Sequence, residues 1–263
     1  MEIKKGFLVK MSFDFYKNKV VLITGDTGFK GSWLAIWLHK LGAKVYGFSK
    51  PPNSEHDNFV ICNLDEKIIH LDGDIRNFKN FYECLKQIKP EIVFHLAAQA
   101  LVLKSYSSPL QTFETNIMGT VNLLEAARLV PEVKVIINVT SDKCYENNEL
   151  NRGYKESDQV GGRDPYSASK GAAEIVSSSY IRSFFFKRDI VSAATVRAGN
   201  VIGAGDWSLN RIVPDFFRSK KNNSKLILRN PNSTRPWQHV LEPLRGYMLL
   251  AIKLYEEGRM FKE

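Results

Sequence analysis

Short apolar runs alternate with longer amphipathic stretches along most of this chain. Residues 19–24 are almost wholly apolar and end at a glycine, a pattern typical of a strand that is buried on both faces of a parallel sheet. Residues 78–88 place their apolar side chains three or four positions apart, which predicts a helix with one buried face. Because the two patterns keep alternating, the sequence predicts an α/β fold built on a doubly wound parallel sheet.

Apolar runs predict strands at 19–24, 44–48, 68–71, 91–96, 134–139 and 190–196. Amphipathic stretches predict helices between them, at 32–41, 78–88, 109–130 and 166–187. Polar segments with proline or glycine predict loops at 50–65 and 145–163. After residue 197 the alternation ends, and the pattern predicts an irregular segment at 199–205, a helix at 210–219, a short strand at 225–228, an extended segment at 235–240 and a helix at 242–255.

The composition is that of a folded globular chain. Its 263 residues suffice for one large α/β domain, or for one domain and part of a second, and 44% of them are hydrophobic. No apolar run approaches the roughly 18 residues that span a bilayer, and the N-terminal apolar stretch is too short for a signal peptide. The three cysteines have neither disulfide nor zinc-site spacing, so we expect a cytoplasmic protein with no bound metal and no membrane partner.

The formal net charge of +9 has two interpretations. A positive surface attracts phosphorylated substrates. The charge can equally reflect a composition rich in lysine and asparagine, as in residues 220–225, and we favour this interpretation. No basic run alternates with aromatic residues as in a nucleic-acid groove, so we expect no nucleic-acid partner.

Tyr166 and Lys170 are the first candidate catalytic pair. Four residues apart at the start of a predicted helix, they lie one turn apart on one face. An ammonium group beside a phenol lowers the pKa of the phenol below its usual value of ~10, so this pair could take a proton from a substrate hydroxyl. Asp142 and Lys143, at the end of a predicted strand, form a second acid/base pair. One pair suffices to oxidise an alcohol, and two suggest a further proton transfer, such as the loss of water.

The segment Gly25-Asp-Thr-Gly28-Phe-Lys-Gly31 joins the first predicted strand to its helix. Glycines there let the backbone approach a pyrophosphate, whose charge meets the amino end of the helix. We therefore expect a dinucleotide site, lined in this turn by Gly25, Thr27, Gly28, Phe29, Lys30 and Gly31, after the third strand by Asp74 and Ile75, and after the fourth by Leu96, Ala97, Ala98 and Gln99. We expect the neighbouring His95 to be a packed, hydrogen-bonded side chain.

The residues leave the choice between NAD and NADP open. An acidic residue after the second strand would bind the ribose hydroxyls of NAD, but Ser49 and Lys50 occupy this position. Lys50 could pair with the 2′-phosphate of NADP, or it could point into solvent.

Together these motifs resemble the extended short-chain dehydrogenases/reductases that act on nucleotide sugars, and within that family the CDP-glucose 4,6-dehydratases. The resemblance is most specific at Ser141-Asp142-Lys143, and further matching motifs lie at 24–34, 140–145, 197–207 and 235–244. It implies NAD as the cofactor, CDP-glucose as the substrate, and a homodimer or larger homo-oligomer. It also implies an NAD-binding Rossmann domain at 15–199 plus 235–257, the start of a substrate-binding lobe at 200–234, and an N-terminal extension at 1–14.

The resemblance also implies a role for each catalytic residue. Tyr166 would take the proton of the glucose 4-hydroxyl while a hydride passes from C4 to NAD. Lys143 would then remove the proton at C5, Asp142 would protonate the departing C6 hydroxyl, and the hydride would return to C6. Ser141 would hold the C4 oxygen beside Tyr166, and Lys170 would also hold the nicotinamide ribose.

The same resemblance implies substrate contacts from Gln99, Ser141, Asn200, Arg211 and Arg235, with the arginines on the phosphates. From the residues themselves, each arginine could form a surface ion pair instead. The chains of this family continue beyond the position of Glu263, so we expect the rest of the substrate lobe to be missing and the activity to be weak or absent. Two alternatives stay open: another nucleotide-sugar dehydratase or 4-epimerase of this fold, and an inactive NAD-binding protein.

Overall fold

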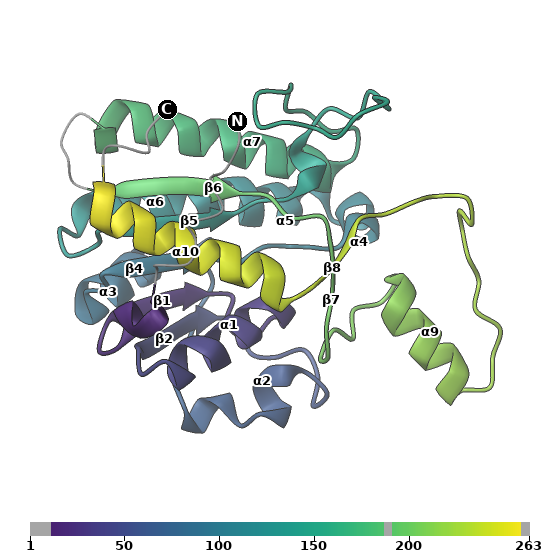
Figure 1. Cartoon of the computed structure of the whole chain (residues 1–263), viewed down its shortest axis with the longest axis horizontal. Helices are drawn as coiled ribbons and strands as arrows, with labels where there is room; N and C mark the ends of the chain where they lie inside the picture. The colour runs from purple at the N-terminus through teal and green to yellow at the C-terminus, as the bar shows by residue number, and fades with distance from the viewer. Residues whose placement is uncertain (1–11, 187–190, 259–263) are drawn as a thin grey trace.

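The computed structural model describes residues 12–186 and 191–258, which form a three-layer α/β structure (Figure 1). Their main sheet has six parallel strands in the order β3-β2-β1-β4-β5-β6. The strands are β1 (Val20–Thr24), β2 (Lys44–Ser49), β3 (Ile69–Asp72), β4 (Ile92–His95), β5 (Val135–Val139) and β6 (Ser192–Val196). The order reverses between β1 and β4, so the predicted doubly wound parallel sheet is confirmed.

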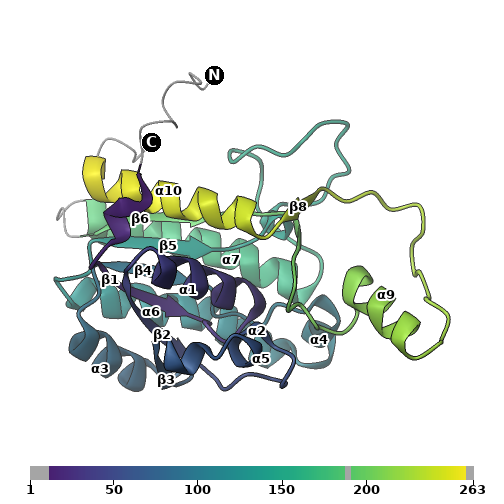
Figure 2. The same ribbon diagram turned by 60° about the horizontal axis from the view of Figure 1, so that its bottom comes forward.

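Helices cover both faces of the sheet, as Figures 1 and 2 show. One face carries α1 (Phe29–Lys40) and α10 (Leu241–Glu257), and the other carries α3 (Phe78–Ile88), α6 (Gly119–Leu129) and α7 (Pro165–Tyr180). Successive side chains of a strand point to opposite faces, so Val21 and Ile23 join the first apolar layer and Leu22 joins the second. None of the helices in the described part of the chain is both long and apolar enough to cross a membrane.

Both long predicted helices continue through a wider π-helical turn. The helix predicted at 109–130 is formed by α5 (Pro109–Phe113), the π turn η4 (Glu114–Met118) and α6. The helix predicted at 166–187 is formed by α7 and the π turn η6 (Ile181–Phe185), and its predicted end at 187 lies outside the described residues. Hydrophobic periodicity located these helices but carries no signal for a π turn, which is common at functional sites.

Three short elements arise in segments where no helix was predicted. The predicted loop at 50–65 contains α2 (Asn58–Ile61) and η3 (Leu64–Glu66), so this prediction was partly wrong. Phe59 and Leu64 are buried in the core, and their burial stabilises these single turns against weak local preference. The third element is α4 (Val102–Ser107), which follows the loop after β4.

The N-terminal turn η2 (Phe13–Tyr16) belongs to the packed structure. Tyr16 is fully buried, and its hydroxyl donates a hydrogen bond to the carbonyl of Met248 at 2.7 Å. The ring of Phe13 lies against that of Trp37. These contacts tie the start of the described chain to α1 and α10.

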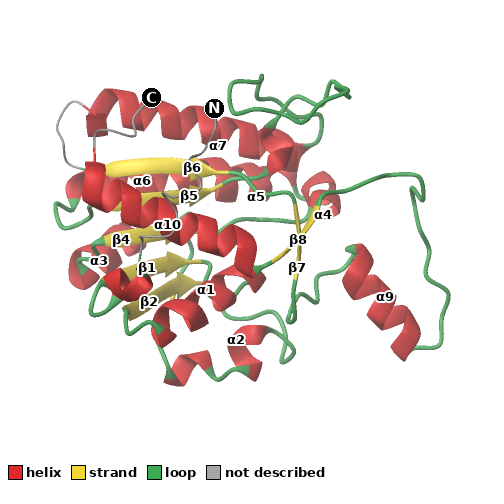
Figure 3. Ribbon diagram, in the orientation of Figure 1, coloured by secondary structure: helices red, strands yellow, loops and turns green. Residues whose placement is uncertain are grey.

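Residues 200–234 form an open lobe beyond the carboxyl ends of the strands (Figure 3). β7 (Asn200–Ile202) pairs in parallel with β8 (Trp237–His239), so the two ends of this segment lie side by side. The extended segment predicted at 235–240 is confirmed, but the one predicted to be irregular contains β7. α9 (Ile212–Lys221) confirms the predicted helix. The strand predicted at 225–228 is wrong, because these residues pair with no strand of the described chain and Ile227 is 84% exposed.

Gly31 tests the close packing of the turn between β1 and α1. A Cβ added there would lie 2.0 Å from the carbonyl oxygen of Gly25, and backbone cannot yield as a flexible side chain can. We therefore expect Gly31→Ala to lower the free energy of unfolding by roughly 1–3 kcal/mol. Urea unfolding checks this.

Gly246→Ala in α10 is the matched control, because nothing lies within 4 Å of its added Cβ. Alanine is favoured over glycine inside a helix by roughly 0.5–1 kcal/mol, so this variant should gain stability. A Gly31→Ala variant as stable as the natural chain would contradict the close packing.

Candidate active site

The turn between β1 and α1 has the geometry of a pyrophosphate cradle. Gly25 has a φ of 79°, and a Cβ added there would lie 2.7 Å from the amide nitrogen of Ala97. The turn therefore packs directly on the loop after β4, which only glycine permits. A Cβ on Gly28 would meet only the Gly25 carbonyl oxygen, so the space above the amino end of α1 is open. Both features fit the pyrophosphate of a dinucleotide.

A buried ion pair supports this turn from below. Asp26 is fully buried, and its Oδ2 accepts a hydrogen bond from Nδ1 of His70 at 2.7 Å. Nε2 of His70 lies 3.2 Å from Asp72, and the absence of a side chain at Gly47 leaves room for the Asp26 carboxylate. Hydrogen bonding to Asp26 raises the pKa of His70 above its usual value, although partial burial opposes this. Oδ1 of Asp26 has no partner within the described chain.

The ribose end of the predicted cofactor site contains a network of charges. Thr27 bonds to the Ser49 hydroxyl at 2.9 Å and to the Lys50 carbonyl at 3.0 Å, so the end of β2 is fixed to the glycine turn. Nζ of Lys50 lies 3.0 Å from Asp74, which also binds the guanidinium of Arg76. Arg76 is the main cause that lowers the pKa of Asp74, and Lys50 contributes. The ammonium of Lys50 is thus paired with a carboxylate.

The structure brings the two predicted acid/base sets together. Tyr166 and Lys170 lie in the first turns of α7, and η5 (Asp142–Cys144) follows β5 at the same edge of the sheet. Ser141 is within hydrogen-bonding reach of the Tyr166 phenol, and its hydroxyl donates to Asp142 at 3.0 Å. Four of these residues are at least partly buried, whereas the side chain of Lys143 is exposed.

The expected lowering of the Tyr166 pKa is wrong for this arrangement. Burial is the largest influence and raises the pKa of Tyr166, while the interaction with the Ser141 hydroxyl and the charge of Arg211 oppose it. The ammonium of Lys170 donates instead to the carbonyl of Val139 at 3.1 Å. Sequence spacing placed the two side chains on one face, but it could not show that burial outweighs the nearby positive charge.

Lys30 and Lys170, two lysines of the candidate site, have lowered pKa values. Burial, reinforced by the charge of Lys30, lowers the pKa of Lys170 to about 8. Burial also lowers the pKa of Lys30 to about 8, and Arg211 acts in the same direction while Asp142 opposes both. These couplings show that α1, η5, α7 and the 200–234 lobe converge on one charged region. Ammonium groups with such pKa values can exchange protons near neutral pH.

The side chains of Gln99, Arg211 and Arg235, which were predicted to bind substrate, already have hydrogen-bond or ion-pair partners in the chain. Gln99 is buried, and its side chain bonds to Leu101 and to Thr112, so it shapes the loop after β4. Arg211 pairs with Asp206 at 2.7 Å, the ion pair that the sequence left open for it. Arg235 is exposed and donates to the carbonyl of Thr234 at 2.8 Å.

The remaining predicted residues line the carboxyl edge of the sheet. Leu96, Ala97 and Ala98 are partly buried after β4, Ile75 is buried under Gly119, and Asn200 is partly buried in β7. His95 is the packed side chain that we expected: its Nδ1 lies 2.7 Å from the Thr24 hydroxyl, and burial lowers its pKa to about 3. No group of three or more His, Cys, Asp or Glu within the described residues is placed to hold a metal ion.

Sequence reasoning missed three polar residues behind the site. Asn116 in η4 accepts from the Gln99 amide at 2.8 Å and donates to the Ser169 hydroxyl at 2.8 Å, which joins the β4 loop to α7. Glu174 and Arg197 form a buried ion pair at 2.9 Å. The position of Glu174, four residues after Lys170, was a usable signal because it puts both on one helix face.

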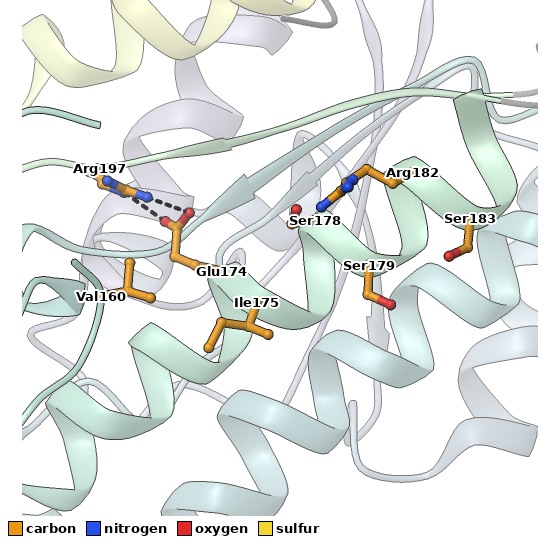
Figure 4. A pocket seen from close by; sticks show the side chains of 8 residues that line it. All are labelled: Val160, Glu174, Ile175, Ser178, Ser179, Arg182, Ser183 and Arg197. Atoms are coloured by element: carbon orange, nitrogen blue, oxygen red, sulfur yellow. Dashed lines mark hydrogen bonds and ion pairs between the residues drawn. The ribbon is translucent and has the colours of Figure 1, made fainter. Parts of the chain in front are cut away.

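None of the predicted site residues lines the cavity of about 680 Å³ beside α7 (Figure 4). It is lined by Glu174, Arg197 and side chains such as Ser178, Ser179 and Arg182 along the helix. The candidate site is therefore assigned from the converging turns at the carboxyl edge and not from this cavity.

Comparisons with known proteins agree with this geometry. Residues 22–257 match the family model described as GDP-mannose 4,6 dehydratase. The chain is 50% identical over 254 residues to the CDP-glucose 4,6-dehydratase of Salmonella typhimurium, across 95% of this chain and 71% of that protein. It is 31% identical to the dTDP-D-glucose 4,6-dehydratase of Dictyostelium discoideum, across 91% of this chain and 57% of that protein.

Among solved structures, the dTDP-glucose 4,6-dehydratase DesIV of Streptomyces venezuelae, a double mutant with NAD bound, has the same fold. It superposes with a TM-score of 0.76 at 24% identity, over 88% of this chain and 71% of that chain.

His70 should make the stability of the cofactor turn depend on pH. A histidine whose pKa is raised by folding stabilises the folded state below its unfolded pKa of ~6.5, and this contribution is lost as the pH rises through the folded pKa. The stability lost in His70→Asn should therefore be largest near pH 6 and shrink toward higher pH, as measured by urea unfolding across a pH series.

Asp26→Asn is the control background for this test, because it removes the main cause of the shift. In that background the same histidine change should lose most of its pH dependence. A His70→Asn deficit that is equal at acid and alkaline pH would contradict a charged His70–Asp26 pair.

Proposed function

Since the chain belongs to the GDP-mannose 4,6-dehydratase family, we propose that it is a nucleotide-sugar 4,6-dehydratase that acts on CDP-glucose with NAD. The product would be CDP-4-keto-6-deoxyglucose. The observation that carries the proposal is the meeting of two acid/base sets, Tyr166 with Lys170 and Asp142 with Lys143, at one edge of the sheet. The identity to a relative named CDP-glucose 4,6-dehydratase supports the choice of base and sugar.

The first proton transfer would use Tyr166. Its phenolate would accept the proton of the glucose 4-hydroxyl, and Ser141 would hold the C4 oxygen within reach of the phenol. NAD held in the glycine turn would supply the acceptor for the C4 hydride and the source of the hydride that C6 later receives. Because burial raises the pKa of Tyr166, the positive charge of Arg211, which lowers that pKa, matters for forming the phenolate.

The second proton transfer would use the neighbouring pair. A ketone at C4 makes the C5 hydrogen acidic, and Lys143 would remove it. Asp142 would protonate the departing C6 hydroxyl, so that water leaves and a C5=C6 double bond forms. When C6 receives the hydride, the protonated Lys143 would return a proton to C5. An epimerase needs only the first pair, and the presence of the second favours the dehydratase over the 4-epimerase alternative.

Residues of the glycine turn would hold the cofactor pyrophosphate, and Lys170 with Tyr166 would hold the nicotinamide ribose. The adenosine end would lie against Asp74 and the loop after β4. The ion pair between Lys50 and Asp74 favours NAD over NADP, since a 2′-phosphate would have to displace a carboxylate from Lys50.

For the nucleotide sugar, Asn200, Arg211 and Arg235 would contact the diphosphate, while Gln99 and Ser141 would lie at the sugar. Arginine suits phosphate oxygens because its guanidinium donates two parallel hydrogen bonds. We propose the same division as the sequence suggested, with residues 15–199 and 235–257 binding the cofactor and residues 200–234 contributing to the substrate lobe.

We further propose a homodimer or larger homo-oligomer in the cytoplasm. Leu110, Met118 and Ile175 are between 50% and 72% exposed on α5, η4 and α7, an apolar surface that a second copy would cover. The free thiols of Cys84 and Cys144 are buried, which suits a reducing compartment.

Turnover of CDP-, dTDP- and GDP-glucose by the purified chain tests the proposed function. Each reaction is followed by the alkaline absorbance of a 4-keto sugar. We expect product from CDP-glucose at a higher kcat/KM than from the other two. Inversion at C4 without a keto product would instead identify an epimerase, and NAD binding without either reaction would identify a non-catalytic protein.

Substitutions of Asp142 and of Lys143 test the proposed acid and the proposed base separately. Asp142→Asn should slow product formation by roughly 10²–10⁴-fold. In deuterated water, substrate recovered from this variant should still contain deuterium at C5, because Lys143 is present to exchange that hydrogen. Lys143→Met should block both exchange and product formation. Unimpaired product formation by Asp142→Asn would contradict its role as the acid, and NAD titration of each variant checks that the cofactor site is intact.

A further inference from the structure

Glu174 is a buried carboxylate that the proposed chemistry does not use. It lies one helical turn after Lys170 and is 7% exposed. It accepts hydrogen bonds from the hydroxyl of Thr140, from that of Thr195 at 2.7 Å, and from Arg197 at 3.0 and 2.9 Å. A carboxylate has about four acceptor positions, so these donors fill it.

These hydrogen bonds join three elements. Thr140 follows β5, Thr195 lies in β6, and Glu174 comes from α7. Figure 4 shows the guanidinium of Arg197 aimed at Glu174, with both contacts drawn. We call this group of Thr140, Glu174, Thr195 and Arg197 the carboxylate clamp.

The carboxylate clamp holds both ends of the catalytic turn. Thr140 directly precedes Ser141, and its amide also donates to the Val196 carbonyl at 2.9 Å. At the other end, the Arg197 guanidinium lies 4.6 Å from the ring centre of Tyr145, the residue after η5. Movement of Glu174 would therefore shift the turn that carries Ser141 and Asp142.

The carboxylate clamp also contributes charge to the catalytic helix. The groups that face Lys170 are Lys30 from α1, His95 from β4, Cys144 from η5 and Glu174 from its own helix. The negative charge of Glu174 raises the pKa of Lys170, whereas burial and Lys30 lower it. Burial opposes ionisation of Glu174, but its bonds to Arg197 and the two threonines outweigh burial and keep its pKa below the usual value.

We propose that Glu174 is a positioning residue for the dehydration: through Thr140 and Arg197 it holds the 141–144 turn against Tyr166. Its negative charge also favours the ammonium form of Lys170. This inference rests on the proposed function. It extends the function by assigning a role to a residue that touches neither cofactor nor sugar in that scheme. Misplacement of a catalytic group by about 1 Å can cost roughly a hundredfold in rate, so the effect should appear in kcat.

Glu174→Gln and Thr140→Val separate the two parts of this role. Glu174→Gln removes the charge and part of the clamp, so we expect kcat to fall roughly a hundredfold with KM for the sugar within about threefold. The alkaline limb of the pH–rate profile should also move to lower pH, because Lys170 loses the charge that favours its ammonium form. Thr140→Val keeps the ion pair and should lower kcat without moving that limb.

Glu91→Gln is the matched control. Glu91 accepts from Lys19 at 2.9 Å and from Tyr255 at 2.6 Å, so it is also a bonded carboxylate in an ion pair. It precedes β4 at the amino edge of the sheet, opposite the catalytic turn. Its variant should lose stability yet keep kcat and the pH profile of the natural chain.

Two readouts need no turnover, which keeps this inference distinct from the proposed function. Titration of the Lys170 amine by ¹⁵N-lysine NMR, assigned with Lys170→Arg, should show a lower pKa in Glu174→Gln. In a Cys62→Ser background, buried Cys144 of η5 should react faster with a thiol reagent in both clamp variants.

If the natural chain converts no nucleotide sugar, the proposed function fails while these two measurements still report the clamp. If Glu174→Gln does not fold, Thr140→Val carries the test of position. The proposal is overturned if a folded clamp variant keeps kcat within about threefold of the natural chain, or if neither Lys170 nor Cys144 responds.

Discussion

Parallel pairing of β1, β4, β5 and β6 sets the position of everything else in the candidate site. The register of these strands places Thr24, His95, Asn138 and Val196 near one edge of the sheet. Each strand then continues into a segment of the candidate site: the glycine turn, the alanine-rich loop, the 141–144 turn and the Arg197 segment. Side chains far apart in the sequence therefore meet without a long connecting loop.

The same arrangement places two ammonium groups, those of Lys30 and Lys170, where burial disfavours their charged form. Burial lowers the pKa values of Lys30 and Lys170 to about 8. The charge of Lys30 lowers the pKa of Lys170 further, and the charge of Arg211 lowers that of Lys30. Asp142 and Glu174 act in the opposite direction from two sides. Such a region suits a substrate that brings two phosphates, and it leaves amines whose protonation changes near neutral pH.

Burial is the constraint on the acid/base chemistry of Tyr166. A phenol in this position resists ionisation, and the hydroxyl of Ser141 and the distant charge of Arg211 only partly offset that resistance. In the proposed mechanism the position of the 141–144 turn therefore has a large influence on the rate, because Ser141 has to stay within reach of the phenol. In the role that we propose for Glu174, its buried bonds to Thr140 and Arg197 hold this turn at the end of β5.

Periodicity in the sequence determined the strand and helix order, the parallel sheet and the glycine turn, because each of these follows from local spacing of apolar residues and glycines. Local spacing also put Tyr166 beside Lys170 on one helix face. Tertiary structure decided what spacing cannot express: the burial that raises the pKa of Tyr166, the pairing of Lys50 with Asp74, and the bonds from Glu174 to Thr140 and Arg197. These depend on the exposure of a side chain and on partners from other strands, and both are fixed only when the sheet and its helices pack together.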